Sequence, residues 1–130
     1  MGASTMKWIS TSVLLGGFVL IPLAHAARDL ACKPAPEIAE RLAELARQWQ
    51  PRLSTESGYS PVLGVTVCLA TSGLPFADQK NMRIYVRPLT SLDAQVTLAH
   101  EYLHLAFAHH PNGRNEVYIE RMAQELVEQP

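Results

Sequence analysis

Hydrophobic residues recur at helical spacing in the segment 35–53, with charged residues between them. They are Ile38, Leu42, Leu45 and Trp49. This pattern predicts an amphipathic helix. Proline lacks the backbone N–H that a continuing helix needs, so the helix is expected to end at Pro51.

Two further segments have the pattern of β-strands. Residues 62–70 (VLGVTVCLA) are mostly apolar and rich in β-branched side chains, which predicts a buried strand. In residues 82–88 (MRIYVRP) apolar residues alternate with polar or aromatic ones, which predicts a half-exposed strand ended by Pro88. One face of this strand carries Arg83, Tyr85 and Arg87. The two strands can pair as a hairpin, although their turn-rich connection of eleven residues is longer than most hairpin loops.

Two more helices are predicted in the last third of the chain. The first spans about 90–109, with Thr90 as its cap and Asp93 in a capping-box position. The proline and glycine of HPNG (110–113) end it, and apolar residues at helical spacing in 114–129 predict the last helix. The fold class is therefore α+β, with an N-terminal helix, a small, mainly antiparallel sheet and two C-terminal helices.

The N-terminus has the pattern of a secretory signal peptide. Lys7 precedes an apolar run at 8–23, and the small residues of AHA (24–26) suit signal peptidase. We therefore expect residues 1–26 to be removed, although an uncleaved membrane anchor is the alternative. Residues 27–130 then form a single exported domain, with no membrane contact after cleavage.

Charge and cysteine content narrow the function further. The formal net charge is −1, and no Lys/Arg cluster would suit a phosphate backbone, so nucleic acid is not expected as a partner. In an oxidising compartment Cys32 and Cys68 can form one disulfide, and two buried free thiols are the alternative. The sequence contains no CxxC spacing, so a cysteine-based metal site is not expected.

The chemistry is carried by the sequence HEYLH at residues 100–104. His100 and His104 lie four residues apart, so on a helix both imidazoles face the same side and can bind one Zn2+. Glu101 is rotated away from that face and can act as the general base toward a water molecule at the metal. The alternative is a helix whose polar face carries these side chains in water.

A catalytic zinc site needs a third protein ligand. His110, ten residues after His100 and at the expected helix exit, is the first candidate. Glu116 is the second candidate. It lies at the start of the last helix, and antiparallel packing of the last two helices would bring that start near the end of the motif helix. His109 and Glu120 are further alternatives.

Other side chains are candidates for substrate contact. Arg114, Tyr118 and Arg121 can stabilise an oxyanion, although each can equally be an ordinary helix-surface residue. The strand 82–88 could bind an extended peptide by strand addition if it lies at a sheet edge beside the motif helix.

With this motif and layout, the chain resembles a minimal zincin metallopeptidase. The resemblance implies that His100 and His104 are zinc ligands and Glu101 the base. His110 matches the third histidine of metzincins, but Phe107 stands where they have glycine, and there is no room for their methionine turn. The Asn115–Glu116 pair instead resembles the glutamate ligand of gluzincins.

The stretches LAHEYLHLAF, HPNGRNE and RIYVRPL also resemble the C-terminal part of a family of predicted secreted bacterial proteins of unknown function. Genes of that family lie near those of bacterial alpha-2-macroglobulins in Gram-negative species. The resemblance implies a periplasmic or secreted protein. It implies no established substrate.

These observations predict an exported zinc-dependent peptidase that hydrolyses a peptide or protein substrate. The main alternative is a non-catalytic zincin-like module that holds zinc or binds a periplasmic partner protein. Metal buffering by the histidines is a third reading, against which the glutamate at position 101 argues, because buffering needs no base.

Overall fold

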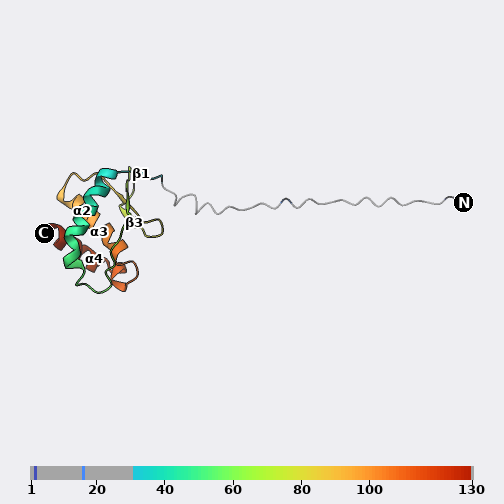
Figure 1. Ribbon diagram of the computed structural model, residues 1–130. Coiled ribbons are helices and arrows are strands. Elements are labelled where there is room, and N and C mark those ends of the chain that lie inside the picture. The colour runs from blue at the N-terminus through green and yellow to red at the C-terminus, as the bar shows by residue number, and fades with distance from the viewer. Residues whose placement is uncertain (1, 3–15, 17–30, 130) are drawn as a thin grey trace. The chain divides into compact units, whose positions relative to one another are not determined.

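A computed structural model describes residues 2, 16 and 31–129. These residues form an α+β fold with three α-helices and a four-stranded, mostly antiparallel sheet (Figure 1), which confirms the predicted class. The predicted signal peptide, 1–26, lies almost entirely outside the described residues. In the described part of the chain, no helix combines the length and hydropathy needed to span a bilayer.

The sheet contains strands β1 (Lys33–Pro34), β2 (Thr66–Leu69), β3 (Phe76–Asp78) and β4 (Arg83–Val86) in the order β1-β2-β4-β3. β2 and β4 are neighbours but run parallel, so the expectation of a hairpin between them is wrong. The connection between them contains β3, which pairs antiparallel with the far side of β4. After β2 the chain first forms β3 at the end of the sheet and then turns back, so β4 fits between β2 and β3 and runs parallel to β2.

β4 occupies the interior of the sheet and not its edge. Its residues Ile84, Tyr85 and Val86 are 0%, 3% and 1% exposed, so the predicted half-exposed edge strand is wrong. Polar and apolar positions alternate along β4, but β2 and β3 pair with its two edges, α3 packs on it and the Phe76 ring of β3 covers Tyr85. The strand at this end of the described sheet is β3, whose Phe76 ring stacks on Tyr85 with centroids 4.4 Å apart.

Helix α2 (Pro36–Leu53) matches the first predicted helix. Proline is favourable at this first position because an N–H there would have no partner within the helix, so its absence costs nothing. The helix continues through Pro51 to Leu53, beyond the predicted end. Its apolar face buries Leu42, Trp49 and Leu53, and the Trp49 ring lies 5.9 Å from that of Tyr102.

Helix α3 (Leu92–Ala106) is shorter than predicted at both ends. Ser91, and not Thr90, is its cap, because the Ser91 hydroxyl accepts a hydrogen bond from the Ala94 N–H at 3.1 Å. A short 3-10 turn, η1 (Pro111–Arg114), then leads into α4 (Glu116–Glu128), which packs against α3.

The turn η1 approaches the end of α3 very closely at Gly113. A Cβ atom at this position would lie 2.2 Å from the Phe107 carbonyl oxygen. Only glycine allows this contact without displacement of the backbone. Gly113 therefore sets how closely η1, and the start of α4 after it, approach α3.

The disulfide between Cys32 and Cys68 is confirmed, with Cα atoms 5.1 Å apart. It joins the residue before β1 to β2, beside the register pair Pro34 and Cys68. Cys68 is fully buried. The bond therefore attaches the start of the domain to the core of the sheet.

Candidate metal centre

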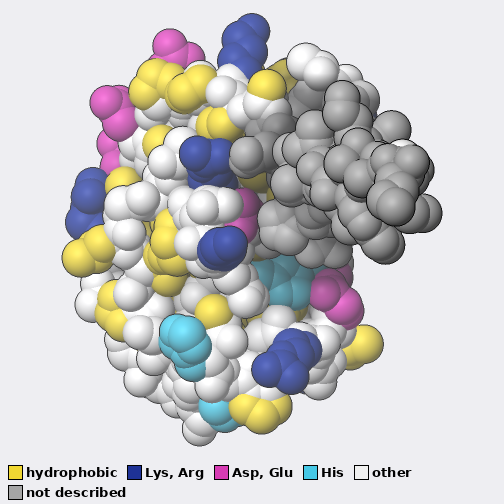
Figure 2. Space-filling view, turned by 90° about the vertical axis from the view of Figure 1, so that its right-hand side faces the viewer, with side chains coloured by type: hydrophobic (Ala, Val, Ile, Leu, Met, Phe, Trp, Pro, Cys, Tyr) yellow, Lys and Arg dark blue, Asp and Glu magenta, His cyan; other side chains and the backbone are white. Residues whose placement is uncertain are grey.

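Helix α3 presents His100 and His104 on one face, as the four-residue spacing predicts. Their Nε2 atoms lie 3.1 Å apart. Both side chains line an open cleft of about 400 Å3. The other cleft residues are Pro75, Phe76, Ala77, Gln79, Glu101 and Glu116. Figure 2 shows histidine and acidic side chains next to one another on this face.

Glu116 joins the two histidines from the first turn of α4. Its carboxylate oxygens lie 2.9 Å from His100 Nε2 and 3.1 Å from His104 Nε2. One ligand atom from each of the three residues falls within 4.8 Å of the others. The start of α4 is held by Asn115, whose Oδ1 accepts from the Tyr118 N–H at 3.1 Å.

The second nitrogen of each imidazole is also paired. His100 Nδ1 lies 2.6 Å from a Glu120 carboxylate oxygen, and His104 Nδ1 lies 2.8 Å from the Gly113 carbonyl oxygen. Both acceptors favour the tautomer with hydrogen on Nδ1, which leaves the Nε2 lone pairs directed at Glu116. This is the arrangement that metal-binding histidines ordinarily show.

Glu101 lies in the same cleft and is only 7% exposed. Burial raises the pKa of its carboxyl group above the usual value, because removal from water disfavours the charged form. The charge of Glu116 adds to this rise, whereas protonation of His100 or His104 would oppose it. A carboxyl group with a raised pKa is a stronger base than an exposed glutamate.

The structure does not bring His110 into this group. Its Nδ1 accepts from the Asn112 N–H at 3.1 Å, so the residue caps η1. Its ring packs so closely on Gly58 that a Cβ there would lie 2.2 Å from His110 Cγ. His109 and His110 line a separate cavity of about 410 Å3 with Arg114. The geometry thus favours Glu116 over His110 and His109 as the third ligand candidate, and it places Glu120 behind His100.

The proposed oxyanion contacts also lie elsewhere. Neither Arg114 nor Tyr118 lines the cleft. The Tyr118 hydroxyl donates to a Glu56 carboxylate oxygen at 3.1 Å, and the Arg121 guanidinium lies 5.8 Å above the Tyr118 ring. Burial together with the bond to Glu56 raises the pKa of Tyr118 to about 12. These contacts connect α4 to the segment after α2.

One wall of the cleft was missed by the sequence reasoning. It comes from β3 and its flanks, which were predicted to be a turn-rich connection. The Gln79 side-chain amide donates to the His104 carbonyl oxygen at 3.2 Å and so ties this wall to α3. The available signal was the apolar pair Phe76–Ala77 between a proline and an aspartate, which is short even for a strand.

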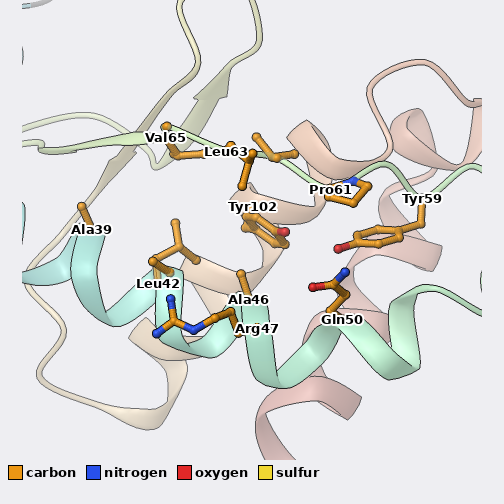
Figure 3. A pocket seen from close by; sticks show the side chains of 13 residues that line it. Ala39, Leu42, Ala46, Arg47, Gln50, Tyr59, Pro61, Leu63, Val65 and Tyr102 are labelled. Carbon is orange, nitrogen blue, oxygen red and sulfur yellow. The ribbon is translucent and has the colours of Figure 1, made fainter.

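Residue 102 directs its side chain to a different cavity. Tyr102 lines an apolar cavity of about 330 Å3 between α2 and the segment 59–65 (Figure 3). Leu42 and Leu63 lie around it in the same view. The successive α3 residues Glu101 and Tyr102 therefore line two separate cavities.

Comparison with known proteins gives two matches. The profile of a family described as "Predicted secreted protein (DUF2300)" matches residues 14–112. An "Uncharacterized protein YfaQ" of Escherichia coli (strain K12) is 36% identical over 96 residues, which are 74% of this chain and 18% of that protein. The chain thus spans less than a fifth of that relative's length. No solved structure matches.

Proposed function

The chain belongs to the family of predicted secreted proteins whose profile covers residues 14–112, and we propose that it is an exported zinc-dependent peptidase. The observation that carries the proposal is the convergence of His100, His104 and Glu116 beside the buried Glu101. We place the protein in the periplasm or outside the cell of a Gram-negative bacterium, which accords with the disulfide.

The donor set fits zinc. Two imidazole nitrogens and one carboxylate form a combination typical of catalytic zinc sites, with a fourth position left for water or substrate. Ligand atoms about 2.1 Å from a tetrahedral ion lie about 3.4 Å apart. The two Nε2 atoms lie 3.1 Å apart, and each lies close to a different Glu116 oxygen, at 2.9 Å for His100 and 3.1 Å for His104. One ligand atom from each residue falls within 4.8 Å of the others, so modest side-chain shifts would bring the three to an ion.

Glu101 is the general base in this proposal. Zinc, when bound, would polarise the scissile carbonyl and make water a better nucleophile. The Glu101 carboxylate takes a proton from the attacking water and later gives it to the leaving amine, so the group ends the cycle as it began. In the metal-free protein, burial raises the pKa of this carboxyl group above its usual value.

An extended peptide is the substrate form that the cleft accommodates best. β3 is the terminal strand of the described sheet and lines the cleft through Phe76 and Ala77. A strand at a sheet edge can pair with the backbone of an added peptide. The strand-addition role expected for 82–88 therefore passes to β3, because β4 is covered by its neighbours.

Zinc content of the purified protein and its variants tests the metal site. We expect one equivalent in wild type and in His110→Ala, and loss of zinc in His100→Ala and Glu116→Ala. His110→Ala serves as the control because it removes an imidazole outside the cluster. Less than a tenth of an equivalent in wild type after zinc dialysis would contradict the proposal.

Glu101→Gln separates a peptidase from a binding module. This variant should keep zinc and lose hydrolysis by a factor of about a hundred or more, because proton transfer contributes roughly 100- to 10,000-fold. If zinc-loaded wild type cleaves no peptide in a diverse library, the non-catalytic zinc-binding module replaces the peptidase as the function.

A further inference from the structure

A further cavity adjoins the metal cleft at the C-terminal end of α3. It has a volume of about 240 Å3, and we call it the side cavity. Gln79 lines both the side cavity and the cleft. The Gln79 side-chain amide donates to the carbonyl oxygen of His104, which is itself a ligand candidate. The two hollows therefore meet at Gln79, directly beside the metal centre.

The side cavity lies one helical turn beyond the cleft along α3. Glu101 lines the cleft, and Leu105, four residues later on the same face of the helix, lines the side cavity. One turn advances about 5.4 Å along a helix. A peptide paired with the outer edge of β3 would advance about 3.4 Å per residue, and β3 leads directly into Gln79. A substrate side chain within two residues of the cleaved bond can therefore reach the side cavity.

The walls of the side cavity are mainly apolar. Its three polar lining residues are Ser60, Gln79 and His109, so no carboxylate lines it. An apolar substrate side chain would leave water for apolar surface, whereas a lysine side chain would find no opposite charge. The apolar lining residues are Pro61, Val62, Leu63, Met82, Leu105 and Ala108.

Three separate segments form these walls, and hydrogen bonds hold them together. The Ser60 N–H donates to the Ala106 carbonyl oxygen at 2.9 Å, which holds the segment 60–63 against α3. The bond from Gln79 to His104, at 3.2 Å, holds the turn between β3 and β4 against the same helix. The side cavity is therefore formed before a ligand arrives, which lowers the entropy cost of binding.

Met82, on the β4 side of that turn, gives independent support. Its backbone lies in the left-handed region with φ of 52°, and no other described residue except glycine has a positive φ. This conformation is unfavourable for a residue with a Cβ atom, and strained residues of this kind concentrate at ligand-binding sites. The Met82 side chain lines the side cavity, and methionine adapts its shape readily to an apolar ligand.

We propose that the side cavity is the specificity pocket of the peptidase and binds a leucine-like side chain within two residues of the cleaved bond. Leu63 and Met82 contact this side chain, and basic side chains are disfavoured at the same substrate position. The inference rests on the proposed peptidase function and names its substrate class.

Matched peptides test the pocket with zinc-loaded protein. Cleavage sites are identified in a diverse peptide library, and Leu, Ala or Lys is then placed at each of the two positions on either side of the cleaved bond. At one position, wild type should prefer Leu to Ala in kcat/KM by about tenfold, and Leu to Lys by more. Absence of this preference at every position would overturn the pocket and leave the peptidase standing.

Two variants test whether the side cavity carries the preference. Leu63 is 88% exposed, so Leu63→Asp leaves the core intact, and the new carboxylate should lower the Leu-to-Lys ratio about fivefold or more. Asparagine tolerates the left-handed conformation, so Met82→Asn should preserve the fold and lower the Leu-to-Ala ratio about threefold. Unchanged ratios in both variants would refute the assignment.

Two controls match the charge change of Leu63→Asp. Leu92→Asp replaces a 53% exposed leucine in the first turn of α3, about 20 Å along the helix from Leu105. Because Leu63 also lines the cavity of Figure 3, the second control is Ala43→Asp, at a residue that lines that cavity but not the side cavity. Both should keep the wild-type ratio, and an equal fall in either control would overturn the proposal.

Binding of peptide hydroxamates tests the same pocket without turnover. Two series carry Leu, Ala or Lys on one side or the other of the zinc-binding group. Tighter binding of the Leu compound in one series, weakened by Leu63→Asp and not by Leu92→Asp, would support the pocket even if no peptide is cleaved. Equal affinities within both series would refute it, whatever the activity.

Discussion

The contact between Glu120 and His100 is the most informative place to perturb the metal centre. Glu120→Gln keeps the size and shape of the side chain but removes its charge. The His100 Nδ1–H then donates to a neutral amide oxygen in place of a carboxylate at 2.6 Å. Glu120 is not among the three ligand candidates, so the donor set itself is unchanged.

The magnitude follows from the kind of bond that is weakened. Carboxylates that support metal-binding histidines typically contribute 10- to 100-fold to affinity, or about 1.4 to 2.7 kcal/mol. The Glu120 side chain is 46% exposed, so water screens part of the interaction. We therefore expect the low end of the range, about a tenfold rise in the Kd for zinc.

The assay is competition for zinc with a chromophoric chelator of known affinity at neutral pH. The matched control is Glu128→Gln, which changes the net charge equally on the same helix, but at an exposed residue outside the cleft. It should change the Kd less than twofold. An unchanged Kd in Glu120→Gln, or an equal rise in both variants, would refute the role assigned to Glu120.

Three further perturbations address other parts of the structure. Tyr118→Phe should cost about 1 kcal/mol of unfolding free energy through loss of the bond to Glu56, but should change zinc affinity and kcat/KM less than twofold; a hundredfold loss of activity would restore Tyr118 as an oxyanion contact. In the metal-free protein, urea unfolding of Glu101→Gln and wild type is compared at pH 4 to 8. Wild type should lose stability as pH rises above 4.5, because Glu101 ionises in its unfolded chain before it ionises in the folded protein, so the advantage of the variant should grow and then level off above the raised pKa. An advantage independent of pH would contradict burial as the cause of the raised pKa. Replacing both Cys32 and Cys68 by alanine should lower the unfolding free energy by about 2–4 kcal/mol, as a crosslink over 36 residues constrains the unfolded chain, and a loss below 1 kcal/mol in denaturant titrations would exclude that role.

Local features of the fold were predictable because neighbouring residues determine them. The helical repeat in 36–53 and the i, i+4 pair His100 and His104 depend only on helix geometry, and both appear where expected. The predicted helix ends were less accurate. Ser91 and Thr90 are both good caps, and only the backbone conformation decides between them.

The sheet required non-local information. The direction of β4 relative to β2 depends on where the chain goes between them, and three residues, Phe76–Asp78, are too few to give a clear alternating pattern. Burial of β4 likewise depends on its packing with β2, β3 and α3, which the pattern within the strand does not specify. The alternation of polar and apolar residues along a strand shows which side chains lie on each face, but not which other elements pack on that face.

The candidate site divides in the same way. By itself the sequence determined the two imidazoles and Glu101, since one helical turn sets their relative directions. Only the tertiary structure decided that Glu116 joins them, that Glu120 supports His100 and that His110 caps η1 against Gly58. The physical reason is that these contacts depend on how closely α4 packs on α3, and Gly113 sets that distance through its contact with Phe107.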